Sequence, residues 1–303
     1  MLGHAKPRST SRTRLIVGDA ASTTFDSLTY IEHIRLLCCE FEIQTNSQDV
    51  IKGLSYITQR AEQDVPLVQR CTVTITWTGD EYRISGDGME EDFELSVTSA
   101  LETVCQRLHS QAIAALPDHI RIGAASGIHA EHAFLMIGPE GAGKTTLALS
   151  LMMEGVDITG DALVLLRDRE ALPFPRKFHA REDSIGRIPT LRTVARFAAC
   201  VSNPQEGRLM ALDPLEFRKP WRIAPVAVST IFYIEPNHGA RTTLLPCGKV
   251  EMIRRMLPLC APPVSGRPDW LGDICATVNQ AGTFVVELGD LDSAMLAMLS
   301  VLG

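Results

Sequence analysis

A glycine-rich segment at residues 138–146, GPEGAGKTT, matches the pattern G-x-x-x-x-G-K-[ST] of a phosphate-binding loop. In such a loop the glycines let backbone N–H groups close around phosphate oxygens, because no Cβ atom blocks the approach. Lys144 can neutralise the β- and γ-phosphates, and the Thr145 hydroxyl is a ligand for Mg²⁺. The pattern therefore predicts a site for a nucleotide with Mg²⁺. The predicted nucleotide-binding residues are Gly138, Pro139, Glu140, Gly141, Ala142, Gly143, Lys144, Thr145 and Thr146.

Two aspartates are candidates for the carboxylate that such a site needs. Asp161 lies within the apolar stretch ITGDALVLL, and Asp168 follows it in the polar turn RDRE. If Asp168 ligates the metal, the chain is an ordinary P-loop NTPase; if Asp161 faces the γ-phosphate, it can take a proton from an acceptor hydroxyl, as a kinase base does. A carboxylate in an apolar stretch is costly to bury without a partner, which favours Asp161 as catalytic base and as metal ligand beside Thr145. An Asx turn after Gly160 is the structural alternative.

The segment GPEGAGKTTLALSLMMEGVDITGDALVLL resembles the catalytic core of the HPr kinase/phosphorylase superfamily, especially its HPr-kinase-like relatives. In that family a short return strand after the loop and helix carries the catalytic aspartate, and here Asp161 follows Lys144 by 17 positions. The segments LPFPRKF and ALDPLEFRKPWRIAPVAVSTIFYIEP also resemble the family, so the resemblance covers about residues 119–259. It implies a sheet related to that of phosphoenolpyruvate carboxykinase, and transfer of a nucleotide γ-phosphate to a hydroxyl, often of a serine.

The sequence departs from that family at three points. HPr kinases proper carry a second acidic residue directly after the catalytic aspartate, where this chain has Ala162. Their histidine on the strand before the loop is replaced by Gly123, and no phosphorylase signature is recognisable. His129 and His132 instead fall in a predicted hairpin turn. The resemblance therefore favours a kinase, without HPr as acceptor and without phosphorylase activity.

A basic run beyond the candidate catalytic strand contains Arg176, Lys177, His179 and Arg181. A guanidinium matches a phosphate bidentately and stabilises the charge that develops during phosphoryl transfer. We predict that Arg176 and Arg181 support the transferred phosphate; a solvated strand end is the alternative. Trp221, in the segment RKPWRIAP, is either a loop anchor or a ring on which a base or an acceptor peptide stacks.

The elements that must hold these residues begin with a smaller α+β domain, predicted at residues 25–118 after a flexible basic tail at 1–24. Its segments rich in β-branched and aromatic residues predict strands, and an amphipathic pattern that Pro117 ends predicts a helix at 98–116. This region shows no catalytic constellation, and we interpret it as a docking or dimerisation module, which would make the chain a homo-oligomer. The predicted strands are 41–45, 71–77, 81–88 and 92–97.

Residues 119–303 alternate strand and helix patterns, which predicts an α/β domain with a largely buried sheet. Together with the motifs this gives the predicted fold class: an α/β P-loop kinase domain related to HPr kinase and phosphoenolpyruvate carboxykinase, preceded by the α+β domain. Strands are expected within IRIGAASGI, HAFLMIG, ITGDALVLL, AVSTIFYIE and TFVVEL, and helices at 145–155, 250–259, 269–280 and 291–302.

Composition limits the other classes of function. The chain has 303 residues, of which 45% are apolar, and no apolar run reaches the roughly 20 residues that span a bilayer. The net charge of −7 argues against general nucleic-acid binding, which needs clustered cations. Eight scattered cysteines without a C-x-x-C spacing are typical of reduced thiols in a cytoplasmic protein. We expect a cytoplasmic protein that binds neither membrane nor nucleic acid.

The leading hypothesis is an ATP-dependent, Mg²⁺-requiring kinase, with Lys144, Asp161, Arg176 and Arg181 as catalytic residues. Its acceptor is a hydroxyl of a protein or ribosomally made peptide, or of a small alcohol. One alternative is a non-catalytic nucleotide-binding module in regulation or assembly, and another is a simple P-loop NTPase that uses Asp168. The sequence does not distinguish ATP from GTP or name the acceptor.

Overall fold

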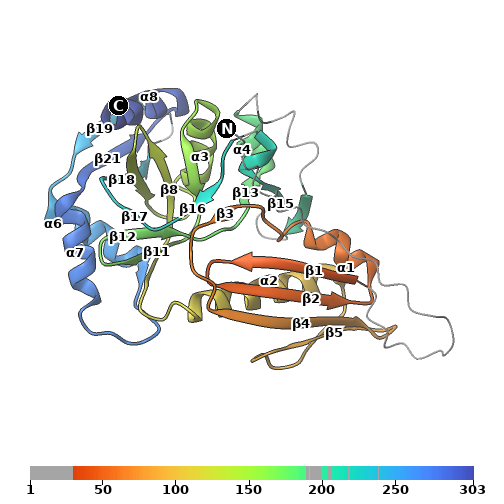
Figure 1. Cartoon of the computed structure of the whole chain (residues 1–303). Coiled ribbons are helices and arrows are strands. Elements are labelled where there is room, and N and C mark those ends of the chain that lie inside the picture. Colours follow the sequence, from red (N-terminus) through yellow and green to blue (C-terminus); the bar gives the residue numbers. More distant parts are fainter. Residues whose placement is uncertain (1–29, 189–190, 192–198, 204–206, 218, 238) are drawn as a thin grey trace, which may run out of the picture. The chain divides into compact units, whose positions relative to one another are not determined.

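The computed structural model of the chain is mixed α/β and divides into two compact units (Figure 1). In its described part, the first unit comprises residues 30–55 and Leu67–Ala112, and the second comprises Tyr56–Pro66 and most of the chain from Ile113 to Gly303. The predicted tail at residues 1–24 lies outside the described residues. The residues that the structure describes are 30–188, 191, 199–203, 207–217, 219–237 and 239–303.

The first unit is a five-stranded sheet in the order β1-β2-β4-β5-β6, with two helices. Side chains along β2 alternate between buried and half-buried, because successive residues of a strand point to opposite faces. In α2 the buried residues recur every fourth position, which places them on one face of the helix. The elements are β1 (Tyr30–Leu36), β2 (Cys39–Thr45), α1 (Gln48–Leu54), β4 (Gln69–Trp77), β5 (Tyr82–Gly86), β6 (Asp92–Glu94) and α2 (Val97–Ala114).

The strands and the helix predicted for this region are present as β2, β4, β5, β6 and α2. The expected hairpin joins β4 to β5, with Trp77 paired to Tyr82. The edge strand β1 and the short helix α1 were not predicted from the sequence. Strand β1 has two adjacent polar residues, Glu32 and His33, that interrupt the alternation, and α1 is only seven residues long.

The second unit contains two large sheets. The first has the order β10-β8-β9-β18-β21-β19, in which β18 runs parallel to β9 and β21 while the remaining pairs are antiparallel. The second has the order β17-β12-β11-β7-β20, with every pair antiparallel. The strands are β7 (Ile120–Ile122), β8 (Ala124–His129), β9 (His132–Ile137), β10 (Asp157–Gly160), β11 (Val164–Arg167), β12 (Glu170–Pro173), β17 (Val226–Ala227), β18 (Thr230–Pro236), β19 (Thr243–Pro246), β20 (Cys260–Ala261) and β21 (Gly282–Leu288).

Two small sheets and several helices complete this unit. Strands β13, β15 and β14 form one small sheet, and β16 pairs with β3 in the other. Helices close to those predicted follow the glycine-rich segment and the last strands. The elements are β3 (Glu62–Gln63), α3 (Lys144–Met153), β13 (Phe178–Arg181), α4 (Glu182–Gly186), β14 (Ala199–Asn203), β15 (Gly207–Leu212), η1 (Pro214–Phe217), β16 (Arg222–Ile223), α6 (Lys249–Met256), η2 (Leu257–Leu259), α7 (Trp270–Gln280) and α8 (Leu291–Leu302).

Two segments that the sequence predicts as single strands are each divided between the two large sheets. The stretch ITGDALVLL contributes β10 to the first sheet and β11 to the second, so Asp161 lies where the chain leaves one sheet for the other. The stretch IRIGAASGI is likewise divided at Gly123, between β7 and β8. Each break falls at residues of low strand propensity, Gly160 to Ala162 in the first stretch and Gly123 in the second, but propensity contains no information on which sheet each half joins. The prediction of unbroken strands was wrong here.

The segment Tyr56–Pro66 also differs from the predicted domain division. The sequence places it in the domain at residues 25–118, whereas in the structure it belongs to the second unit. Its strand β3 runs parallel to β16, with Glu62 paired to Arg222. The cause is a long-range pairing, which no local pattern in the sequence reveals.

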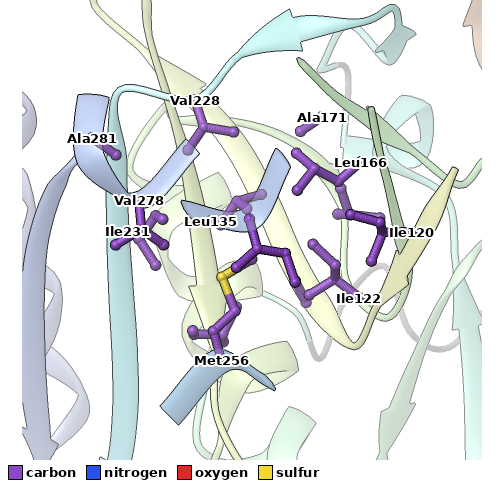
Figure 2. Close-up of a cluster of buried hydrophobic side chains, with 14 of the residues drawn as sticks. Ile120, Ile122, Leu135, Leu166, Ala171, Val228, Ile231, Met256, Val278 and Ala281 are labelled. Atoms are coloured by element: carbon purple, nitrogen blue, oxygen red, sulfur yellow. The ribbon is translucent and has the colours of Figure 1, made fainter. Parts of the chain in front are cut away.

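The main core of the second unit lies between the strands of both large sheets and helices α6 and α7 (Figure 2). Leu135 of β9 and Ile231 of β18 are buried in it together with Leu166 of β11, and Met256 and Val278 reach them from the helices. Each fully buried aliphatic side chain contributes about 1.5–3 kcal/mol of transfer free energy. This core holds β9, and hence the start of the glycine-rich segment, in place.

Leu135→Ala is expected to lower the free energy of unfolding by about 2–5 kcal/mol, because it removes a side chain that is 1% exposed and leaves a cavity. Urea unfolding followed by circular dichroism measures the change. Leu296→Ala is the control, since Leu296 is 65% exposed and its loss should cost at most about 0.5 kcal/mol. Equal effects of the two substitutions would contradict the position of the core.

Among the helices of the described chain, none is long and apolar enough to cross a membrane. The cysteines whose side chains the structure describes are free thiols: Cys38, Cys39, Cys71, Cys105, Cys247, Cys260 and Cys275.

Candidate active site

The glycine-rich segment Gly138–Gly143 lies between the end of β9 and the start of α3. Gly138 has φ of 151°, and a Cβ atom there would lie 2.5 Å from the backbone oxygen of Ile234. Gly143 has φ of 93°, and its Cβ atom would lie 2.8 Å from Cδ2 of Leu288. Only glycine fits these two positions without strain. The loop therefore brings its backbone to the N-terminus of α3, where the first N–H groups of a helix have no intrahelical partner and attract anions.

Lys144 is the first residue of α3 and reaches back over the loop. Its ammonium donates hydrogen bonds to the backbone oxygens of Gly138, at 2.8 Å, and Pro139, at 2.9 Å. Burial lowers the pKa of Lys144, while the nearby carboxylates of Glu140 and Asp161 raise it. The lysine thus lies at the mouth of the loop, in the same electrostatic environment as Asp161.

Asp161 directly follows β10 and is 5% exposed. The Thr145 hydroxyl donates to its Oδ2 at 3.4 Å, and Nη2 of Arg176 lies 3.8 Å from its Oδ1. Burial raises the pKa of Asp161, and the Arg176 guanidinium, the Thr145 hydroxyl and the backbone amide of His179 lower it. The structure thus brings together the helix that follows the loop, the buried aspartate and one of the two predicted arginines.

Two buried polar atoms at this point have no hydrogen-bond partner among the described residues: Oδ1 of Asp161 and Nε of Arg176. An unpaired buried polar atom costs about 1–3 kcal/mol, so such atoms are rare without a functional reason. A carboxylate oxygen accepts hydrogen bonds or ligates a metal ion, and a guanidinium nitrogen donates hydrogen bonds to an anion. Together, Asp161 and Arg176 can therefore bind a phosphate group, its metal ion and an acceptor hydroxyl.

Asp168, the other candidate carboxylate, lies in the tight turn between β11 and β12. Its φ of 50° and that of Arg169, 69°, are typical of a two-residue hairpin turn. Its side chain is 71% exposed and accepts a hydrogen bond from Nε of Arg167 at 3.2 Å. The hairpin belongs to the second large sheet, whereas the glycine-rich segment follows a strand of the first. This position gives Asp168 an ordinary role as a turn residue.

The basic run is divided by the structure. Arg176 lies against Asp161, whereas Arg181 is an exposed residue at the end of β13, where it precedes α4. Lys177 is buried and faces the carboxylates of Asp213 and Glu216. The ring of His179 stacks on Tyr56, with 4.7 Å between the centroids. Of this run, Arg176 reaches the candidate base through its side chain and His179 through its backbone amide.

Trp221 contacts the strand that directly precedes the candidate base. Its indole nitrogen donates to the backbone oxygen of Thr159 at 3.0 Å, and its ring packs edge-on against Phe178. The Thr159 hydroxyl forms a buried hydrogen bond with that of Ser126, at 2.9 Å. Trp221 is 2% exposed, so it anchors its loop and is not available to stack on a base or a peptide. Sequence reasoning did not find Ser126 or Thr159, and hydroxyls in apolar strands are the only signal they give.

The candidate site therefore lies in a mixed α/β unit. It consists of a glycine-rich turn before helix α3, a lysine at the start of α3 and a buried carboxylate beside the first turn of that helix. No protein-family model and no curated protein matches the chain. Among solved structures, the HPr(Ser) kinase/phosphatase from Coxiella burnetii is similar to it, with a TM-score of 0.27 and 10% sequence identity. The match covers 60% of this chain and 99% of that one. That protein's name agrees with the family that the motifs resemble, but a similarity this weak supports no assignment.

Proposed function

We propose that this chain is an ATP-dependent kinase that transfers the γ-phosphate to a hydroxyl group. The observation that carries the proposal is the buried Asp161 carboxylate. It accepts a hydrogen bond from Thr145, in the first turn after the glycine-rich loop, and its other oxygen has no hydrogen-bond partner among the described residues. A carboxylate in that position suits a base for an acceptor hydroxyl, because burial raises its pKa and thereby its basicity.

In the proposed reaction, the loop N–H groups and Lys144 hold the β- and γ-phosphates. Asp161 accepts the proton of the acceptor hydroxyl while the hydroxyl oxygen forms a bond to the γ-phosphorus. The bond from that phosphorus to the β–γ bridging oxygen breaks, and ADP leaves. Arg176, beside Asp161, stabilises the negative charge on the transferred group. Arg181 is not part of this proposal.

The residues present fit Mg²⁺. The Thr145 hydroxyl and the Asp161 carboxylate are hard oxygen donors, and one carboxylate oxygen is buried without a hydrogen-bond partner. Thr145 and Asp161 would hold the ion, whose charge would neutralise phosphate oxygens. No cluster of three or more His, Cys, Asp or Glu that could hold a metal occurs in the described chain. This agrees with Mg²⁺, which takes one or two carboxylates and completes its shell with water and substrate phosphates.

The acceptor in this proposal is a protein or peptide hydroxyl, such as a serine, or a small alcohol. We place the reaction in the cytoplasm, where ATP is available and thiols stay reduced. We further propose that the first unit docks a partner or a second copy of the chain, because the described residues there include no candidate for phosphoryl-transfer chemistry. Nucleic acid and membrane are not proposed as partners.

Incubation of the purified chain with γ-labelled ATP, Mg²⁺ and a cellular extract tests the proposal, with identification of the labelled species. A labelled acceptor whose formation requires the chain is the expected result. ATP binding by calorimetry without any labelled product would instead favour a regulatory nucleotide-binding module. Release of labelled inorganic phosphate at the same rate with and without extract would favour a simple NTPase.

Transfer is expected to increase with pH through the pKa of Asp161, since only the ionised carboxylate accepts a proton. In the metal-free chain, burial raises the pKa of Asp161 above the ordinary carboxyl value of about 3.9. The charged groups that face Asp161 are Arg176 and Lys144, and both favour its ionised form. A pH–rate profile at saturating ATP measures this acidic limb. A bound Mg²⁺ would also favour the ionised form, so a rate that does not fall at any acidic pH at which the chain stays folded would contradict Asp161 as the base.

A further inference from the structure

The segment Tyr56–Pro66, called here the 56–66 segment, lies in sequence between α1 and β4 of the first unit but packs within the second. Figure 1 shows β3 of this segment beside β16. The amide of Glu62 donates to the backbone oxygen of Trp221, and that of Asp64 donates to the oxygen of Ile223, both at 2.8 Å. The segment is thus attached to the same loop whose Trp221 side chain holds Thr159, two residues before the candidate base.

The same segment contacts β13 directly through Tyr56, and through Arg60 it contacts Asp213, which directly follows β15. Tyr56 stacks on the ring of His179, with an angle of 25° between the planes, and the backbone amide of His179 hydrogen-bonds to Asp161. Nε of Arg60 lies 3.2 Å from Oδ2 of Asp213, a carboxylate with no exposed surface, and Asp213 attracts the ammonium of Lys177. Residues 177 and 179 are therefore both linked to this segment.

Arg176 lies in the loop between β12 and β13, where regular backbone pairing does not define its position. On its N-terminal side, its amide donates to the oxygen of Phe174 at 2.9 Å, and the amide of Phe174 donates to Leu163 at 3.0 Å. On its C-terminal side the next residue is Lys177, whose buried ammonium is attracted by the carboxylates of Asp213 and Glu216 and repelled by the Arg60 guanidinium that fixes Asp213. The orientation of Arg176 toward Asp161 therefore depends on what holds Lys177 and His179.

We infer that the 56–66 segment is a positioning element of the transfer site. Through Tyr56 and Arg60 it holds residues 177 and 179, and thereby keeps Arg176 and the Asp161 carboxylate in their mutual geometry. The catalytic part of this inference rests on the proposed function. The structural part, that the 56–66 segment holds the backbone of residues 174–181, is independent of it.

Hydrogen exchange measured by mass spectrometry tests the structural part without any activity. In Tyr56→Ala and in Arg60→Gln, peptides covering residues 174–181 should lose protection, while peptides covering 138–153 keep it. Glu62→Gln is the matched control, because its ion pair with Arg222 lies on the same segment but is exposed on both sides. Arg60 is 53% exposed, so Arg60→Gln keeps the test valid if Tyr56→Ala does not fold. Unchanged protection at 174–181 in the folded variants would overturn the inference.

Kinetics test the catalytic part. A displacement of Arg176 and Asp161 should lower kcat by up to about 100-fold while the KM for ATP stays within about twofold. Tyr56→Phe keeps the aromatic stack on His179 and should therefore have the wild-type kcat, in contrast to Tyr56→Ala. Wild-type kcat in both Tyr56→Ala and Arg60→Gln would overturn a positioning role. If the wild-type chain transfers no phosphate, the proposed function fails, and the exchange data still decide whether the segment holds residues 174–181.

Discussion

Asp161→Asn is expected to lower phosphoryl transfer by about 100- to 10,000-fold, because the amide cannot accept the proton of the acceptor hydroxyl. ATP affinity should change much less, since the loop amides and Lys144 remain in place. The measurement is the initial rate of label transfer from γ-labelled ATP, with calorimetry for ATP binding. The Thr145 hydroxyl can still donate to the amide oxygen of asparagine, so the local geometry is retained.

Stability provides the check that this loss does not come from unfolding. Burial raises the pKa of Asp161 in the folded chain above its value in the unfolded chain. Its protonation therefore stabilises the fold at low pH, and this stabilisation is lost as pH rises through the folded pKa. At neutral pH the buried charge costs stability, so Asp161→Asn should have a Tm equal to or higher than that of the wild type. A variant that is more stable and yet inactive identifies a functional carboxylate.

Asp168→Asn is the matched control, since Asp168 is an exposed aspartate in a hairpin turn seven residues farther along. Its replacement should leave both transfer and ATP binding unchanged. If Asp161→Asn stays fully active, or if Asp168→Asn is the inactive variant, the assignment of the base is wrong. ATP hydrolysis that survives Asp161→Asn and requires no acceptor would instead support a simple NTPase.

Lys144→Ala is expected to weaken ATP binding by about 2–5 kcal/mol, which corresponds to about 30-fold or more in Kd. The ammonium lies at the loop, bonded to the oxygens of Gly138 and Pro139, where it is placed to neutralise phosphate oxygens. Isothermal titration calorimetry with ATP and Mg²⁺ measures the change.

Lys52→Ala, in the first unit, is the control for this substitution. The Lys52 side chain lies in an exposed ion pair with Asp49, so its removal should leave ATP binding unchanged. Urea unfolding of Lys144→Ala separates a loss of binding from a loss of the loop structure. If Lys144→Ala binds ATP as tightly as the wild type and is equally stable, the glycine-rich segment is not the nucleotide site.

Local sequence patterns contain much of the candidate site. The spacing of Gly138, Gly143 and Lys144 predicts a turn that only glycine accommodates, and the structure has such a turn before α3. The preference for Asp161 over Asp168 came from the cost of a charge in an apolar stretch, and the burial of the two side chains differs in that direction. The glycine positions and the burial of Asp161 agree with these patterns because φ preference and the apolar character of a stretch are local properties, while the roles of these residues stay predictions.

Long-range contacts explain what the sequence could not show. Arg176 and Arg181 are equivalent cations in one basic run, and only the path of the chain from β12 into β13 places one of them against Asp161. The stretch ITGDALVLL is divided between two sheets with the aspartate at the break; Gly160, Asp161 and Ala162 there have low strand propensity, but only the tertiary structure assigns the two halves to different sheets.

By itself, then, the sequence determined the glycine-rich turn, the lysine and hydroxyl at the helix start, and the aspartate that had to be buried. Only the tertiary structure decided which arginine meets that aspartate and that residues 56–66 hold the backbone around it. The physical reason is range: propensity, turn geometry and burial cost act over a few residues. The Tyr56 stack and the Arg60 ion pair join residues more than a hundred positions apart, and they form only when the whole unit packs.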